Sequence, residues 1–153
     1  MQDPERTRAR QLGATYQPHF ILLDAEGRIV DTWEGGGDDV VWEAWDGNNT
    51  AQDAGVPWAL PRSGRDGVAG FFRDVAAGLE FHSFEPRNLL EGGNQVAATI
   101  SFDATAKATG ERFQDEEIHL WTFDEDGKVT AFRHYLDTAK HIKAAKGSLA
   151  EVG

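Results

Sequence analysis

Alternating apolar and polar positions near the C-terminus predict a β-hairpin. The two runs cover residues 116–123 and 128–137, and Asp126-Gly127 stands between them. Asp-Gly between alternating runs is a strong signal for a two-residue type I′ turn, which pairs Glu125 with Lys128. The register then sets four further pairs opposite one another: Glu117 and Leu136, His119 and His134, Trp121 and Phe132, and Phe123 and Thr130.

This register gathers two imidazoles and a carboxylate among aromatic rings, because cross-strand partners lie on the same face of a sheet. Titratable groups in an apolar wall are typical of a binding or catalytic pocket. A four-residue loop would keep the same residues on that face. A three-residue loop with a bulge would break the alignment.

The rest of the pattern predicts a helix and further strands. Apolar residues recur at helical spacing from Val68 to Leu79, and Ser63 precedes them as a plausible N-cap. Residues 39–44, 80–89, 95–107, 112–123 and 128–137 read as strands, with a long loop at 46–62. Residues 19–33 fit either a hairpin or a short helix, and residues 138–153 fit a frayed helix or a disordered end.

Helical material, one strand, a helix and four antiparallel strands, in that order, are typical of an α+β domain. A long and strongly twisted sheet can curl over the helices and enclose a cavity. We therefore predict a single domain over residues 1–140, followed by a C-terminal tail over residues 141–153.

Composition narrows the possible partners. The chain has 153 residues, enough for one domain with a substantial core, and its formal net charge of −11 repels phosphate backbones and anionic membranes. It has no cysteine, which excludes disulfides and fits a reducing cytoplasm. It also has no apolar run long enough to span a membrane, and from its polar start, Met1-Gln-Asp-Pro-Glu-Arg6, we expect no signal peptide. We expect a cytoplasmic protein with neither nucleic acid nor membrane as a partner.

Several local motifs resemble the SnoaL-like branch of the ketosteroid isomerase and nuclear transport factor superfamily. They are Asp38-Asp-Val-Val-Trp-Glu43, Ser63-Gly-Arg-Asp-Gly-Val-Ala-Gly-Phe-Phe72, Ile118-His-Leu-Trp-Thr-Phe123, Asp126-Gly-Lys-Val129 and Phe132-Arg-His-Tyr-Leu-Asp-Thr138. The resemblance runs from about Gly37 to Lys140 and leaves residues 1–36 as an atypical N-terminal region. It implies a cone-shaped, curved antiparallel sheet packed on N-terminal helices.

The resemblance does not carry over an intact catalytic set. The position of the steroid isomerases' general-base aspartate is Ala44, with Asp46 two residues on, and their oxyanion donors fall on His19 and His119. In limonene epoxide hydrolase a strand aspartate occupies the position of His134. The chain therefore resembles both families in shape and neither in chemistry.

His119 and His134 are the candidate catalytic residues, because an imidazole exchanges protons near neutral pH. Glu117, on the same face, could fix a histidine tautomer or act as the acid. The alternative is a structural histidine pair that packs into a mixed pocket. The same imidazoles could bind a metal with His19 or Glu117, but no His-x-His or His-Glu-x-x-His spacing is present. We expect no metal and no cofactor.

Aromatic side chains predict a pocket for a small hydrophobic molecule that is polyketide-, steroid- or terpenoid-like. Its expected lining residues are Trp42, Phe72, Trp121, Phe132, Leu136 and His19. Two functions stay open. One is isomerase, cyclase or hydrolase chemistry, and the other is a non-catalytic binding or association module.

The opposite face of the last hairpin is also apolar and needs a cover. It carries Ile118, Leu120, Thr122, Ala131, Arg133 and Tyr135. The family resemblance implies a homodimer through this outer sheet face.

Overall fold

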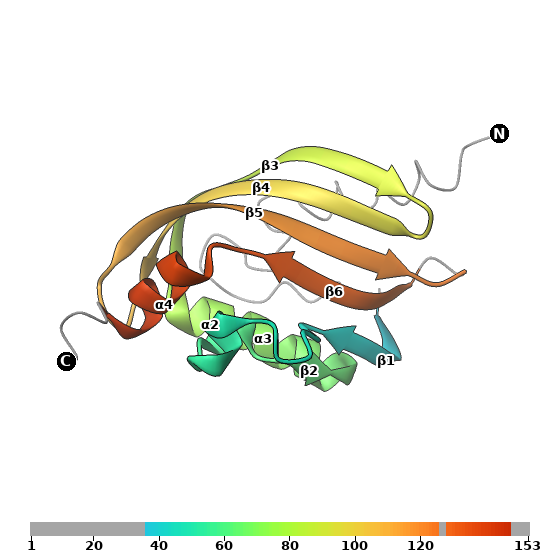
Figure 1. Ribbon diagram of the computed structural model, residues 1–153, viewed down its shortest axis with the longest axis horizontal. Helices are drawn as coiled ribbons and strands as arrows, with labels where there is room; N and C mark the ends of the chain where they lie inside the picture. The colour runs from blue at the N-terminus through green and yellow to red at the C-terminus, as the bar shows by residue number, and fades with distance from the viewer. Residues whose placement is uncertain (1–35, 126–127, 148–153) are drawn as a thin grey trace.

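A single curved sheet packed on short helices makes up the domain (Figure 1). The structure, a computed structural model, describes residues 36–125 and 128–147. The strands are β1 (Gly36–Trp42), β2 (Arg62–Ser63), β3 (Leu79–Gly92), β4 (Gln95–Ala106), β5 (Arg112–Phe123) and β6 (Val129–Tyr135). The helices are α2 (Thr50–Asp53), the 3₁₀ turn η1 (Pro57–Ala59), α3 (Gly64–Gly78) and α4 (Thr138–Lys146).

The strand order is β2-β1-β6-β5-β4-β3, and the long strands β3, β4 and β5 arch over α3 (Figure 1). This arrangement confirms the predicted α+β cone. One detail differs from the expected antiparallel sheet, because β1 runs parallel to β6. The chain between them includes α3 and four strands, so no hairpin fixes their relative direction.

The β5–β6 register confirms the predicted pairing at the candidate site. His119 pairs with His134 and Trp121 with Phe132. The ladder ends at Ile118 and Tyr135, so the expected pair of Glu117 and Leu136 lies just beyond it.

The prediction is wrong near the loop of this hairpin. Asp124 donates its backbone N–H to Lys128 at 2.8 Å, and Phe123 pairs with Val129 rather than with Thr130. Thr130 is the extra residue of a bulge that restores the predicted register from Thr122 onward. A three-residue connection and a bulge therefore occur together, and they offset each other. The expected Asp126-Gly127 turn lies outside the described residues.

Helix α3 places its apolar face against the sheet. Val68, Phe71, Phe72 and Val75 are buried, as their spacing predicts. Ser63 occupies the N-cap position without a side-chain capping bond. Gly78 ends the helix where a Cβ atom would lie 2.9 Å from the Trp58 ring. Only a residue without a side chain lets that ring pack so closely against the end of α3.

Two segments are more ordered than their sequence suggests. The expected loop at 46–62 contains α2, η1 and the short strand β2. The expected frayed or disordered end begins with α4, where the Asp137 side chain accepts from the backbone N–H of Lys140. Thr109 donates its hydroxyl to the carbonyl of Ala144 at 2.5 Å. Helix α4 runs across residue 140, the predicted end of the domain, and its His141 is buried.

The centre of the core is a group of aromatic rings around Trp42. Its ring stacks on Phe132 with centroids 4.2 Å apart and meets Trp121 edge-on at 5.7 Å. Phe71 and Phe72 approach it from α3. Among the described helices, none is both long and apolar enough to cross a membrane.

Candidate functional site

A cavity lies between α3 and the inner face of the sheet. The space in it that admits a water-sized sphere is about 50 Å³, and all of its empty space, including the part open to solvent, is about 530 Å³. Aromatic rings form most of its wall, and four titratable side chains reach it: Glu117, His119, His134 and His141. All four are buried. Titratable groups in an apolar cavity are the combination that the alternating pattern of β5 and β6 predicts.

His134, on β6, is held by the carboxylate of Glu43. Oε1 of Glu43 lies 2.5 Å from Nδ1 of the ring and accepts the backbone N–H of His134 at 2.8 Å. Oε2 accepts the indole N–H of Trp45 at 2.7 Å. Burial lowers the pKa of His134, but the charge and the hydrogen bond of Glu43 outweigh burial and raise it above its ordinary value. This environment favours the imidazolium.

Glu43 reaches His134 because its backbone departs from the strand. Val40 and Trp42 of β1 are buried and Val41 is exposed, so a regular strand would point the next side chain outward. Glu43 has φ +58°, a left-handed conformation that few non-glycine residues adopt, and its side chain is fully buried. Its N–H donates to the carbonyl of Phe132 at 2.9 Å. Such backbone strain is concentrated at functional sites.

His119, on β5, faces His134 with ring centroids 5.8 Å apart. Its Nε2 lies 2.8 Å from Oε2 of Glu117. Burial lowers the pKa of His119 and outweighs the hydrogen bond and charge of Glu117, so the pKa falls below its ordinary value. The ring is therefore neutral near pH 7. With its proton on Nε2 and donated to Glu117, its lone pair is on Nδ1.

Glu117 itself stays ionised although it is buried. Burial raises its pKa, but hydrogen bonds from His119 and His141 and the charge of His134 hold it well below its usual range.

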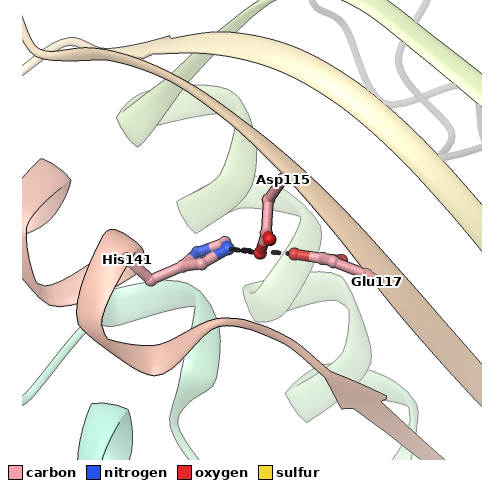
Figure 2. Close-up of side chains that lie close together, drawn as sticks. All are labelled: Asp115, Glu117 and His141. Atoms are coloured by element: carbon pink, nitrogen blue, oxygen red, sulfur yellow. Dashed lines mark hydrogen bonds and ion pairs between the residues drawn. The ribbon is translucent and has the colours of Figure 1, made fainter.

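A third histidine, His141 of α4, lies against two carboxylates of β5 (Figure 2). Its Nε2 is 3.0 Å from Oδ2 of Asp115 and 3.0 Å from Oε1 of Glu117. Trp58 donates its indole N–H to Nδ1 of the same ring at 2.9 Å. Burial lowers the pKa of His141, and the hydrogen bonds and charges of the two carboxylates act in the opposite direction and would raise it above its ordinary value if nothing bonded Nδ1. The Trp58 bond opposes protonation, because Nδ1 accepts an N–H only while it carries no proton. The geometry is therefore that of a neutral ring with its proton on Nε2.

Asp115, Glu117 and His141 are also close enough to share a cation, since their ligand atoms lie within 4.8 Å of one another. A metal ion on Nε2 of His141 would require the ring proton to move to Nδ1. The Trp58 N–H already points at Nδ1, so the tautomer in this cluster opposes metal binding. That no metal binds here stays a prediction, and a cation titration would test it.

Four of the expected lining residues, Trp42, Phe72, Trp121 and Phe132, border the cavity. Leu136 packs against the core but is not part of the cavity wall. His19 lies outside the described residues. Asp46, the carboxylate nearest the family's general-base position, is exposed.

Sequence reasoning missed four members of the site: Glu43, Trp58, Asp115 and His141. Asp115 was within reach, because it continues the alternation that makes Glu117, His119 and Trp121 share one face. Glu43 could not have been predicted, since alternation along β1 places the residue after Trp42 on the outer face. Nothing in the local pattern marks Trp58 or His141, whose positions depend on tertiary packing.

Similar solved structures share this fold. An NTF2-like protein of unknown function from Burkholderia pseudomallei superposes with a TM-score of 0.69, at 18% identity over 95% of this chain and 99% of that one. TerC, co-crystallised with polyporic acid, superposes with a TM-score of 0.64, at 21% identity over 90% of this chain and 96% of that one. SalBIII superposes with a TM-score of 0.63, at 18% identity over 89% of this chain and 95% of that one. It is an epoxide hydrolase/cyclase-like enzyme of pyran ring formation in the polyether salinomycin. No curated protein matches the chain.

The curved sheet over α3 and the cavity between them define an NTF2-like α+β cone. A family model for the SnoaL-like domain matches residues 27–132, which is more than half of the chain. The chain belongs to the SnoaL-like family.

Proposed function

We propose that this protein binds a small, flat, hydrophobic ring compound in the cone and transfers protons on it, as an isomerase, cyclase or hydrolase does. His119 is the general base and His134 is the general acid. One observation carries this proposal: two facing imidazoles sit in environments that move their pKa values in opposite directions. Such a pair supplies a base and an acid at the same pH.

The reaction moves two protons. Nδ1 of His119 takes one proton from a carbon next to a carbonyl, or from an attacking hydroxyl, and the imidazolium that forms is stabilised by Glu117. His134 gives one proton to the oxygen on which negative charge develops, and the Nδ1–H bond to Glu43 holds its ring in place. Each transfer contributes roughly 10²- to 10⁴-fold to a rate. In an isomerisation, the His119 imidazolium then gives its proton to the γ-carbon of the dienol, and the dienol oxygen returns its proton to His134. In a cyclisation or hydrolysis, transfer of one proton from His119 to His134 through solvent restores the starting state.

The cavity wall supports a ring-shaped ligand. Trp42, Phe72, Trp121 and Phe132 present aromatic surface, which favours flat apolar molecules. Two similar proteins are consistent with this class, since TerC was crystallised with polyporic acid and SalBIII acts in pyran ring formation.

The test is an isomerisation assay on cyclohex-3-enone, a small β,γ-unsaturated ketone whose conjugated product absorbs in the ultraviolet. We expect turnover by the parent and a loss of at least about 10²-fold in His119→Gln and in His134→Gln. His82→Gln is the matched control, because His82 is exposed on β3 and bonds Thr105 away from the cavity. Equal rates in all four proteins would contradict the histidine roles.

A binding assay separates catalysis from a non-catalytic module. Thermal shifts with polyporic acid measure binding without turnover. Stabilisation that survives both histidine substitutions but is lost in Trp121→Ala, with no turnover by the parent, would favour the binding module.

We also propose a homodimer through the outer face of β1, β5 and β6, in a cytoplasmic protein. Support comes from three exposed apolar side chains on these strands, Val41, Ile118 and Tyr135, which are 41–44% exposed. The absence of cysteine fits a reducing compartment. Light scattering should give twice the chain mass for the parent and one chain mass for Ile118→Asp. Leu90→Asp, on the edge strand β3, is the control that keeps the parent's mass.

A further inference from the structure

The cluster around His141 contains two buried carboxylates that face one another. Asp115 and Glu117 lie on the same face of β5, and their side chains are 4% and 5% exposed. Both place an oxygen 3.0 Å from Nε2 of His141 (Figure 2). Two buried anions at this separation do not both stay ionised without a donor between them. The N–H of His141 is that donor.

The two carboxylates do not depend on His141 equally. Asp115 also accepts the backbone N–H groups of Glu116 at 2.9 Å and Asp137 at 3.1 Å, and Nζ of Lys140 lies 3.9 Å from it. The second oxygen of Glu117 is bonded to His119. Without His141, Glu117 would therefore be the carboxylate that takes up a proton.

A protonated Glu117 would change the tautomer of His119. Its O–H would donate to Nε2 of His119, which accepts only if the ring proton moves to Nδ1. The proton would then occupy the lone pair of Nδ1, and His119 could no longer accept a proton from the substrate at that atom. The orientation of His141 is fixed in turn by Trp58, whose N–H occupies Nδ1.

We propose that His141 is a positioning residue which, through Glu117, keeps the proton of His119 on Nε2 and so preserves the basic lone pair on Nδ1. The catalytic consequence rests on the proposed function, whereas the tautomer itself does not. The charged and titratable groups around His141 are Asp115, Glu117 and His119 of β5, His134 of β6 and Lys140 of α4.

The experiment is ¹⁵N NMR of the histidine rings, which distinguishes Nδ1–H, Nε2–H and doubly protonated rings. In the parent at pH 7 we expect both His119 and His141 as Nε2–H tautomers. A parent spectrum that shows His119 as Nδ1–H, or His141 as doubly protonated, would overturn the proposal without any variant.

Two substitutions test the coupling. His141→Phe keeps a ring beside Phe102 and Phe113 but removes the N–H, and His119 should move to the Nδ1–H tautomer. His141→Gln is the rescue, because its amide N–H can donate to the carboxylates while its oxygen accepts from Trp58; it should keep the parent tautomer. An unchanged His119 in a folded His141→Phe protein would overturn the coupling, and if this variant does not fold, the parent spectrum still decides.

Kinetics separate this inference from the proposed function. Where the parent turns over a substrate, His141→Phe should lower kcat by roughly 10²- to 10⁴-fold with KM nearly unchanged, since a wrong tautomer disables a base without removing binding contacts. His141→Gln should recover most of the rate. Full activity in His141→Phe beside an inactive His119→Gln would reject the positioning role alone. An inactive parent with the expected tautomers would reject the proposed function alone.

Discussion

Each side of the cavity carries a buried histidine bonded to a glutamate, but the pKa of the histidine is raised on one side and lowered on the other. On the side of β1 and β6, Glu43 raises the pKa of His134. On the side of β5 and α4, Glu117 bonds His119, yet the pKa of that ring falls. Both rings are buried to a similar degree. Burial and residue identity alone therefore do not explain which histidine is charged.

The difference lies in how each carboxylate is shared. One oxygen of Glu43 accepts both the ring and the backbone of His134, so its charge is directed at one imidazole. Glu117 divides its two oxygens between His119 and His141, and His119 also faces the charge of His134. The shared carboxylate of Glu117 does not overcome the burial of His119, whereas His141 has a second carboxylate, Asp115, beside it. Acid and base roles thus follow from the number of rings on each carboxylate.

Removing Glu43 should have the largest effect on stability, because it takes away the glutamate whose charge is directed at one imidazole, that of His134. We expect Glu43→Ala to cost about 3–5 kcal/mol in the free energy of unfolding, since His134 and Trp45 lose a buried partner. Urea denaturation at pH 7 measures this change. Glu43→Gln is the matched control of similar shape and should cost less.

The same variants test the charge of His134. In Glu43→Gln burial remains but the anion is gone, so the pKa of His134 should fall below its ordinary value, towards the behaviour of His119. NMR titration of the imidazole reads this directly. A His134 pKa unchanged from that of the parent would show that Glu43 is not what distinguishes the two rings.

Trp58→Phe should change the other side of the cavity with a smaller effect on stability. The indole N–H no longer blocks Nδ1 of His141, so its pKa should rise, while His134 keeps its parent value. The lost hydrogen bond and the smaller ring should cost about 1–3 kcal/mol. Imidazole titration and urea denaturation of the same sample report both quantities. A rise at His134 of equal size would mean that the two sides are not independent.

The pH dependence of stability should differ between the two sides. The raised pKa of His134 means that its contribution is fully present below about pH 6.5 and is lost as pH rises through the folded-state pKa. The lowered pKa values of His119 and Glu117 act in the opposite direction, because their contributions are lost as pH falls through the folded-state values.

The measurement is the free energy of unfolding of the parent and of Glu43→Gln at pH 6 and pH 9.5. The advantage of the parent should shrink at the higher pH by about 1.4 kcal/mol for each pH unit that lies both between the two folded-state pKa values of His134 and within this range. His141 is present in both proteins, so its titration cancels in the difference. A constant advantage across this range would contradict the raised pKa of His134.

An exposed pair should show the smallest effect. Arg112 binds Asp103 through Nε and Nη2 on the outer face, and this pair lowers the pKa of Asp103 to about 2. In Arg112→Ala that pKa should return towards its ordinary value, with no measurable change in the urea midpoint or in the histidine titrations. A clear loss of stability would mean that solvent screens this pair less than its exposure implies.

Much of the fold follows from alternation and helical spacing. Alternation along β5 and β6 predicts which residues face the cavity, and the spacing from Val68 to Leu79 predicts the buried face of α3. Both patterns are local and repeat over several residues, so a single irregularity does not erase them. The same reasoning brings Glu117, His119 and His134 to one site.

The electrostatics of that site were not predictable in the same way. Glu43 enters through a single left-handed residue, which no alternation rule anticipates. His141 comes from a short helix of mixed composition, and Trp58 from a 3₁₀ turn inside an apparent loop. These residues decide which histidine is charged, and they meet only after the chain has folded.

The bulge at Thr130 has a consequence for how this hairpin tolerates change. The connection is one residue longer than a two-residue turn, and the bulge at Thr130 compensates for that residue. The pairing of His119 with His134 lies beyond the bulge and therefore does not depend on the length of the connection alone. Lengthening or shortening the connection by one residue, with a matching change at the bulge, would leave the imidazoles opposite each other. The sequence of the β5–β6 connection can thus be varied separately from the geometry of the site. Variants with a different connection could be made without changing the residues that line the cavity.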